Sequence, residues 1–284
     1  PVVCAPEDPA ALTAWLREAD KECDYFVISL DQLLSGGLVG SRYLSNTDLT
    51  KEYEIIDFLV ELCENNTVYV FDTVMRLAST VNYNGLQQEE YNLFRAYGAE
   101  PRATLSGSAL TIENIVAGYK NGTDGSPIST SLSEEKINSY LASRERKLRL
   151  IDRLLRSGGG KLAYLFVGVD DSTPGNTIQT NEISYIRSLL GEQATLYAGT
   201  DELGMMGVAR LASDLKELYF DVAFISVNGF SKENGFSCRS ADRWYMERTA
   251  VSRASLVVVL MDSTKVGRVC SFSICGPDGI DKLV

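Results

Sequence analysis

The chain has 284 residues, of which 45% are hydrophobic, and a formal net charge of −11 at pH 7. This supplies enough apolar material for the core of one or two domains. Such acidity disfavours binding to a phosphate backbone, so we expect no direct nucleic-acid partner. The sequence contains no histidine, which excludes Ser-His-Asp and Cys-His catalysis and leaves acid–base chemistry to Asp, Glu, Lys, Tyr or Cys.

The cysteines and the apolar runs indicate a cellular setting. Six cysteines are scattered without a CxxC pair, which is typical of reduced thiols in a cytoplasmic protein. No apolar run reaches the roughly 18 residues of a membrane helix, so we expect no membrane partner. The chain begins with Pro1 and stops at Val284 inside a predicted helix, and we expect both ends to be cut. Nothing in the sequence indicates an oligomeric state.

Taken in chain order, short apolar runs alternate with amphipathic segments, and this alternation predicts β–α units. Asp8 and Pro9 are typical of a first helix start. The predicted strands cover 25–30, 68–71, 162–168, 194–197, 221–227, 256–260 and 269–272; the predicted helices cover 9–21, 47–64, 87–97, 108–119, 133–156 and 177–190, then one ending near 218, 242–253 and one from 277.

The predicted fold class is therefore α/β, with a mostly parallel sheet or partial barrel of repeated β–α units. A helical excursion interrupts it at about 79–157. The basic segment RERKLRLIDRLLR at 144–156 is interpreted as a solvated helix face rather than an anion site. Gly158–Gly160 with Lys161 superficially resemble a phosphate loop, but they follow a helix and are better explained as its C-cap.

Carboxylates follow most of the predicted strands. Asp170 and Asp171 end the strand at 162–168, and Asp31, Asp72, Asp201 and Glu202 sit at or just past other strand ends. Singly, each is explained as a helix N-cap or turn former. Together they predict a ring at one edge of the sheet, because the carboxyl ends of parallel strands share one face.

Crowded carboxylates shift one another's pKa, or bind a divalent cation such as magnesium or calcium, and both alternatives stay open. The first suits glycoside hydrolysis, in which one carboxyl protonates the leaving oxygen. The candidate catalytic residues are Asp170, Asp171, Asp201 and Glu202. The candidate substrate-binding residues beside them are Asp31, Arg42, Asp72, Arg76 and Asn176. Of the two arginine roles, pairing with the acids is favoured over holding substrate anions.

Residues 1 to about 208 resemble a bacterial domain-of-unknown-function family, number four-one-two-seven. The matching stretches are ISLDQLLSGGLVGSR, YVFDTVMRLAST, YLASRERKL, GVDDSTPGNTIQTNEISY and AGTDELGMMGVAR. The resemblance implies an enzyme-like β/α domain encoded near carbohydrate genes. The family turn usually carries an aromatic residue before its glycine, whereas Gly175 follows Pro174 directly here. The adjacent aspartates also look like the paired acids of O-GlcNAcase-type glycosidases.

Residues from about 213 to 284 are similar to the second half of the sugar-phosphate-sensing domain of DeoR-type transcriptional regulators. The residues that carry this are DLKELYFDVAFISVNGFSKENGFSC and VVVLMDSTKVGR. By this resemblance Asp262 and Lys265 lie in a sugar-phosphate pocket whose wall includes Asn228 and Gly229. The resemblance does not extend to the helix-turn-helix with which these regulators bind DNA.

These observations predict domains at 1–210 and 211–284 and three functional alternatives. The first is a glycosidase-like hydrolase with no resident cofactor, acting on a sugar. The second is a fragment of a sugar-phosphate sensor. The third is a non-functional chimera joined near 208–213.

Overall fold

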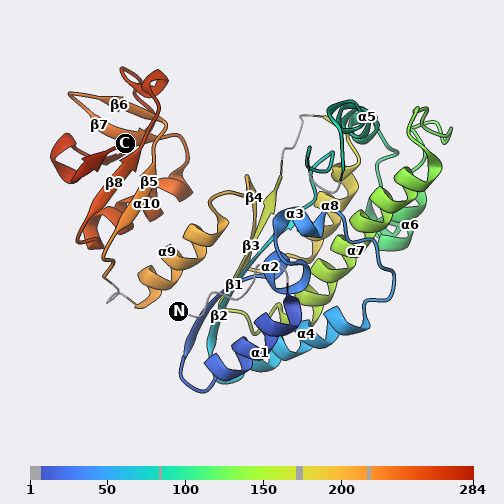
Figure 1. The fold of residues 1–284 in the computed structure, drawn as a ribbon, viewed down its shortest axis with the longest axis horizontal. Coiled ribbons are helices and arrows are strands. Elements are labelled where there is room, and N and C mark those ends of the chain that lie inside the picture. The colour runs from blue at the N-terminus through green and yellow to red at the C-terminus, as the bar shows by residue number, and fades with distance from the viewer. Residues whose placement is uncertain (1–7, 83–84, 171–174, 216–218) are drawn as a thin grey trace. The chain divides into compact units, whose positions relative to one another are not determined.

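A computed structural model describes residues 8–82, 85–170, 175–215 and 219–284 (Figure 1). The chain forms two compact units, one ending at Gly204 and the other beginning at Met205. The helix α9 (Leu203–Leu215) spans this division, and the domain boundary predicted at 210 falls inside it. Each unit is described by itself.

The first unit is built on a four-stranded sheet. Its strands are β1 (Tyr25–Ser29), β2 (Thr67–Val74), β3 (Tyr164–Val169) and β4 (Ala194–Ala198), in the order β1-β2-β3-β4 and all parallel. Because the strands pair in parallel and alternate with helices along the chain, the predicted α/β class is confirmed. In the described residues the sheet is open, not the partial barrel that the sequence also allowed.

One helix precedes the first strand of this sheet, and the others occupy the connections between the strands. They are α1 (Pro9–Ala19), α2 (Leu30–Ser35), α3 (Leu38–Ser41), α4 (Thr50–Leu62), α5 (Gln88–Ala99), α6 (Ile112–Gly118), α7 (Glu134–Gly158) and α8 (Gln179–Leu189). The helical excursion predicted at about 79–157 is confirmed as α5, α6 and α7. Figure 1 shows α4, α7 and α8 along the same side of the sheet, with α7 between the other two.

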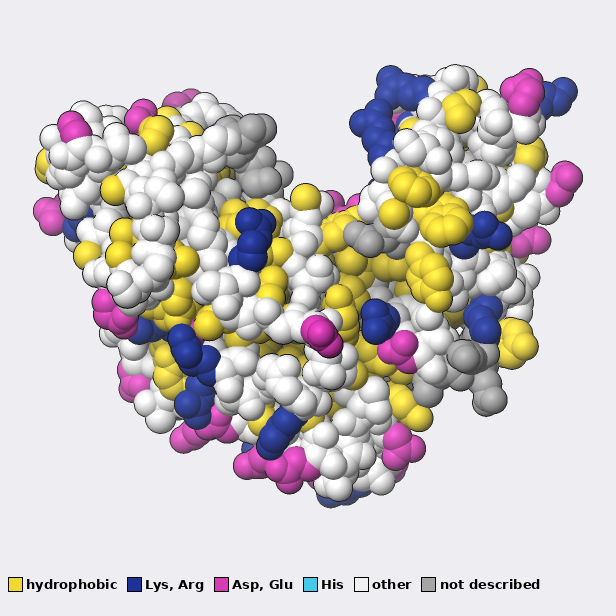
Figure 2. All heavy atoms as spheres, turned by 180° about the vertical axis from the view of Figure 1, so that it is seen from behind, with side chains coloured by type: hydrophobic (Ala, Val, Ile, Leu, Met, Phe, Trp, Pro, Cys, Tyr) yellow, Lys and Arg dark blue, Asp and Glu magenta, His cyan; other side chains and the backbone are white. Residues whose placement is uncertain are grey.

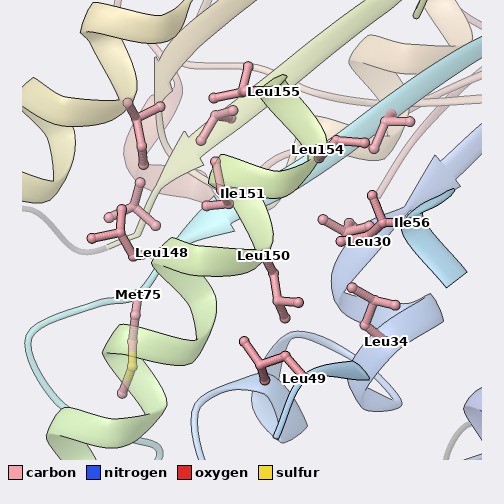
Figure 3. Packing of buried hydrophobic residues seen from close by; sticks show 14 of the residues in the cluster. Leu30, Leu34, Leu49, Ile56, Met75, Leu148, Leu150, Ile151, Leu154 and Leu155 are labelled. Atoms are coloured by element: carbon pink, nitrogen blue, oxygen red, sulfur yellow. The ribbon is translucent and has the colours of Figure 1, made fainter. Parts of the chain in front are cut away.

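The 25-residue helix α7 is the centre of the first core. Its Leu150 and Leu154 point toward Leu34, Leu49 and Ile56, which come from α2, the segment before α4, and α4 (Figure 3). Its Leu148 lies on the other side, near Met75 at the end of β2. Burying side chains of this size stabilises a fold by roughly 1.5–3 kcal/mol each. The helix is therefore anchored along most of its length.

The second unit contains two small sheets. One is parallel, in the order β10 (Lys282–Leu283), β8 (Val257–Leu260) and β5 (Ala223–Ser226). The other is antiparallel, in the order β6 (Gly229–Ser231), β7 (Gly235–Cys238) and β9 (Phe272–Cys275). The helix α10 (Ala241–Arg253) packs on the second sheet.

Two sequence predictions for this unit are wrong. The helix predicted from Pro277 is a single 3-10 turn, Pro277–Gly279, because Asp281 and Val284 continue into backbone bonds with β8. The hairpin of β6 and β7 was missed. Its signal was present as Asn234-Gly235, since Gly235 takes a φ of +68° that favours glycine.

The surface carries mixed charge. On the face shown in Figure 2, basic and acidic side chains of the described residues are interspersed. None of the described helices combines the length and the apolar character needed to cross a bilayer.

Candidate active site at the carboxyl ends of the strands

Three predicted acids lie together where β1, β2 and β3 end. Ser29 pairs with Phe71, and Thr73 pairs with Gly168, so Asp31 and Asp170 each follow their strand at the level of Thr73 or just beyond. Asp31, Asp72 and Asp170 are all buried, with 5%, 3% and 7% of their surface exposed. Asp72 lies inside β2, because that strand runs three residues past the predicted end at 71.

Lys147 of α7 holds two of these acids. Its ammonium donates hydrogen bonds to Asp31, to Asp72 Oδ1 at 3.0 Å and to Thr73 Oγ1 at 3.2 Å. Thr73 in turn donates to Asp31 Oδ2 at 2.7 Å. All three ammonium protons therefore have an acceptor, and two carboxylates share one cation.

The pKa values of Asp72 and Lys147 both differ from their ordinary values in this buried arrangement. Burial raises the pKa of Asp72 to about 7, and the neighbouring Asp31 charge adds to this while Lys147 opposes it. The two carboxylates raise the pKa of Lys147 above its ordinary value despite its own burial. The ammonium thus stays charged, and the carboxyl that changes its charge near neutral pH is Asp72.

Arg42 holds the third acid. Its Nη2 pairs with Asp170 Oδ2, and its Nη1 donates to Thr80 Oγ1 at 2.6 Å. The predicted pairing of Arg42 with an acid is therefore confirmed. Burial lowers the pKa of Arg42, and the nearby charges of Asp170 and Asp31 oppose that shift. Because Asp31 acts on both cations, the two ion pairs form one network.

Arg42 also borders a cavity of about 220 Å³. Gln179, at the start of α8, fixes the strand ends next to it by donating to Asp170 O at 3.0 Å and Met75 O at 2.9 Å. The ends of β2 and β3 are therefore held at a set spacing beside the cavity.

A further buried ion pair was missed by the sequence analysis. Arg144 of α7 donates to Glu182 of α8 from Nε at 2.8 Å and from Nη2 at 2.5 Å. Tyr119 donates to the same carboxylate at 2.8 Å. Arg144 also donates to the carbonyls of Met75 and Arg76, just past β2.

The interpretation of residues 144–156 as a solvated face is therefore wrong for their first turn. Arg144, Arg146 and Lys147 are 1%, 1% and 5% exposed. A signal existed: Tyr140, Arg144, Lys147 and Ile151 recur at the i, i+4, i+7, i+11 spacing of the apolar stripe. The buried carboxylates of Glu182 and Asp31 pair with Arg144 and Lys147, which lie in the apolar stripe of α7.

Of the other predicted residues of the first unit, Arg76 lies close to Arg42, whereas, within the described part of the chain, Asn176, Asp201 and Glu202 are not partners in these ion pairs. Arg76 follows β2 closely enough for its charge to lower the pKa of Arg42 further. Asn176 exchanges hydrogen bonds with the backbone of Arg102, at 2.5 and 3.4 Å. Asp201 is exposed and Glu202 half-buried, in the turn after β4. Asp171 and Pro174 lie outside the described residues.

Another cavity, of about 560 Å³, is lined by residues that include Arg239 and Arg268, and three of the predicted residues of the second unit contact these arginines without lining the cavity. Asn228 accepts from the backbone N–H of Arg239 at 3.3 Å. A Cβ on Gly229 would lie 2.6 Å from the carbonyl oxygen of Arg268. Arg268 N donates to Lys265 O at 3.3 Å, and Lys265 pairs with Asp262 at 3.4 Å.

The alternative of a divalent cation at the carboxylates finds no support in this geometry. Across the described residues, no three His, Cys, Asp or Glu side chains converge as metal ligands do. The position between Asp31 and Asp72 is taken by the Lys147 ammonium.

A family model described as "Protein of unknown function (DUF4127)" matches residues 4–233. The match extends past the end predicted near 208, so it includes the first part of the segment that resembles the DeoR-type sensor. No curated protein matches the chain.

Proposed function

The chain belongs to the DUF4127 family, and from the geometry of its buried carboxylates we propose that the first unit is a glycosidase-like hydrolase. The observation that carries the proposal is the gathering of Asp31, Asp72 and Asp170 at the ends of three adjacent parallel strands, where Arg42, the partner of Asp170, also lines a cavity. Such an edge is where open α/β sheets bind their ligands.

The groups available suit hydrolysis by carboxyls. In the proposal Asp170, oriented by Arg42, is the carboxylate that touches the substrate, and Asp171 follows it in the sequence. Asp72, whose pKa burial raises to about 7, shares Lys147 with Asp31 and changes its charge near neutral pH. Asp72 contacts Lys147 and not the cavity, so it is a positioning residue. Asp201 and Glu202 belong to the neighbouring strand end.

The test is turnover of chromogenic aryl glycosides by the whole chain. We expect Asp170→Asn to lower kcat at least 100-fold, as loss of a catalytic carboxylate does. The control is Asp57→Asn, which removes an acid from a half-exposed Asp–Arg pair with Arg153; its kcat should be unchanged.

Asp170→Asn alone leaves Arg42 buried without its charge partner. The double variant Asp170→Asn with Arg42→Met removes both charges and should melt cooperatively while staying inactive. Full turnover by either variant, or no turnover of any glycoside by the folded wild-type chain, contradicts the proposal.

A second candidate function concerns the second unit, which we propose binds a sugar phosphate. The specific observation is that Asn228, Gly229 and Lys265 each adjoin a residue of the arginine-lined cavity. Two guanidiniums and an ammonium suit a phosphate group.

Calorimetry with hexose and pentose phosphates against the unphosphorylated sugars tests this second function. Lys265→Ala and Arg268→Ala should each weaken binding about tenfold. Arg248→Ala removes a guanidinium that stacks on Trp244, 5.3 Å from the ring centre, and serves as the control. Equal affinity in all three variants, or no binding by the wild-type chain, argues against it.

A further inference from the structure

The cavity beside Arg42 has a mixed wall. Its lining includes Arg42, Tyr43, Ser79, Phe94, Tyr140 and Ser143. The rings of Phe94 and Tyr140 lie against each other with centroids 5.1 Å apart. An aromatic wall with several hydroxyl groups suits a ligand that has both apolar C–H faces and hydroxyls, as a sugar ring does.

The charges on the wall are already balanced. Among the residues that the structure describes, three charged side chains line the cavity: Arg42, Glu90 and Lys136. Arg42 pairs with Asp170, and Lys136 of α7 pairs with Glu90 of α5. Since each has a counter-ion, an added charged group would compete with an existing pair. The lining therefore favours a neutral ligand.

One donor of the site is unused. Among the described residues, Arg42 Nε is buried and has no hydrogen-bond partner. An unsatisfied buried donor costs about 1–3 kcal/mol. A hydroxyl of a ligand in the cavity would supply the missing acceptor once the guanidinium turns toward it. Arg42, the residue that pairs with Asp170, would therefore favour a ligand that carries a hydroxyl group.

The size of the cavity limits what enters. At about 220 Å³ it is smaller than the roughly 300–1,000 Å³ of ordinary ligand pockets. Asp170 is buried and pairs with Arg42, which lines this space. One sugar ring fills such a cavity, and the interior of a polysaccharide does not fit in it.

We propose that the cavity binds a single neutral sugar ring, the terminal residue of its substrate, so that the enzyme removes monosaccharides from chain ends. This specificity rests on the proposed hydrolase function, but occupancy by a monosaccharide is measured separately. Ser139→Phe is the test variant, because Ser139 lines the cavity yet is exposed on α7. Asn138→Phe, at the adjacent exposed position and not lining the cavity, is the matched control.

The first measurement is calorimetric titration of the whole chain with neutral hexoses and N-acetylhexosamines. We expect one of them to bind the wild-type chain, Ser139→Phe to weaken it at least tenfold, and Asn138→Phe to leave it unchanged. Equal weakening by both variants, or none by Ser139→Phe, overturns the proposal, as does tighter binding of charged sugars.

The second measurement is product sizing after digestion of oligosaccharides labelled at the reducing end. Release of monosaccharides alone supports the proposal. Internal cleavage overturns it while leaving the hydrolase function standing. Monosaccharide binding that Ser139→Phe weakens, without hydrolysis of any substrate, supports the occupant of the cavity and overturns the hydrolase function.

Discussion

Arg144 and Glu182 form a two-pronged ion pair in the interior of the first unit, joining α7 to α8. The guanidinium is 0% and the carboxylate 4% exposed, and their paired contacts are 2.8 and 2.5 Å. Tyr119 and two backbone carbonyls satisfy the remaining polar atoms around them. A pair so enclosed stabilises little relative to apolar residues, but removing one partner strands a charge.

Glu182→Ala should therefore destabilise the first unit by about 3–5 kcal/mol. At roughly 2–4 °C per kcal/mol, calorimetry should show its Tm falling by at least about 6 °C. The double variant Arg144→Met with Glu182→Met should recover much of this loss. Glu18→Ala, in an exposed pair with Lys21, should cost less than about 1 kcal/mol. A double variant as unstable as Glu182→Ala would show that the charges themselves are needed.

Tyr119→Phe removes only the hydroxyl that donates to Glu182 Oε1 at 2.8 Å. We expect a loss of about 1–3 kcal/mol, because the bond is buried and its acceptor is charged. Urea unfolding of the variant measures this. Tyr245→Phe is the control, since its hydroxyl bonds Ser213 at the surface. Equal effects of the two changes would contradict the buried role of Tyr119.

The titration of the Asp72 carboxyl should be visible in the pH dependence of the free energy of unfolding. Folding raises its pKa to about 7 from an ordinary value of 3.8, so between these pH values the folded state binds a proton that the unfolded state releases. This carboxyl therefore favours folding below about pH 4, and its contribution is lost as the pH rises toward 7. Asp72→Asn cannot titrate.

The stability of Asp72→Asn relative to wild type should therefore increase between pH 4 and pH 7 and level off above. Denaturant unfolding at several pH values measures the difference. Lys147 contributes in the same sense but only at alkaline pH, because its raised pKa keeps it charged throughout this range. A difference that does not change between pH 4 and pH 7 would mean that Asp72 is ionised in the folded state.

Gly168→Ala should destabilise β3. An added Cβ would lie 2.4 Å from Gly199 O and 2.7 Å from Leu203 Cδ1. Overpacking against backbone costs about 1–3 kcal/mol, measured as a fall in Tm. Gly191→Ala is the control, because its Cβ would meet nothing within 4 Å. If Gly168→Ala melts at the wild-type temperature, the turn after β4 does not rest on β3.

The hydrophobic periodicity of the sequence predicted much of the secondary structure of the first unit. The runs YFVIS and YLFVGV are apolar on both faces, and the parallel sheet that this predicted is present. The grouping of Asp31, Asp72 and Asp170 was predictable because parallel strands end at one edge. The burial of Arg144 and Lys147 was indicated by their place in the apolar stripe of α7, but their acidic partners could not be identified, because those acids are distant in the sequence.

The second unit was less predictable for a different reason. Its strands are only two to four residues long, and β9 begins at Phe272 where the sequence suggested an end. Over such lengths, period-2 alternation scarcely differs from chance. The turn at Gly235 was the stronger local signal, and pairing of β7 with β9 depends on residues more than thirty positions apart.

Because Arg144, Arg146 and Lys147 of α7 pair with acids on other helices, the number of residues that precede them in the helix cannot change without breaking these pairs. One added residue turns the following part of an α-helix by about 100°. An insertion between Ser133, which caps α7, and Arg144 would rotate Arg144, Arg146 and Lys147 away from Glu182, Glu52 and Asp31 together. The same insertion after Gly158, where α7 has ended, would leave all three pairs in register. We therefore expect the fold to accept an inserted residue after Gly158 but not between Ser133 and Arg144.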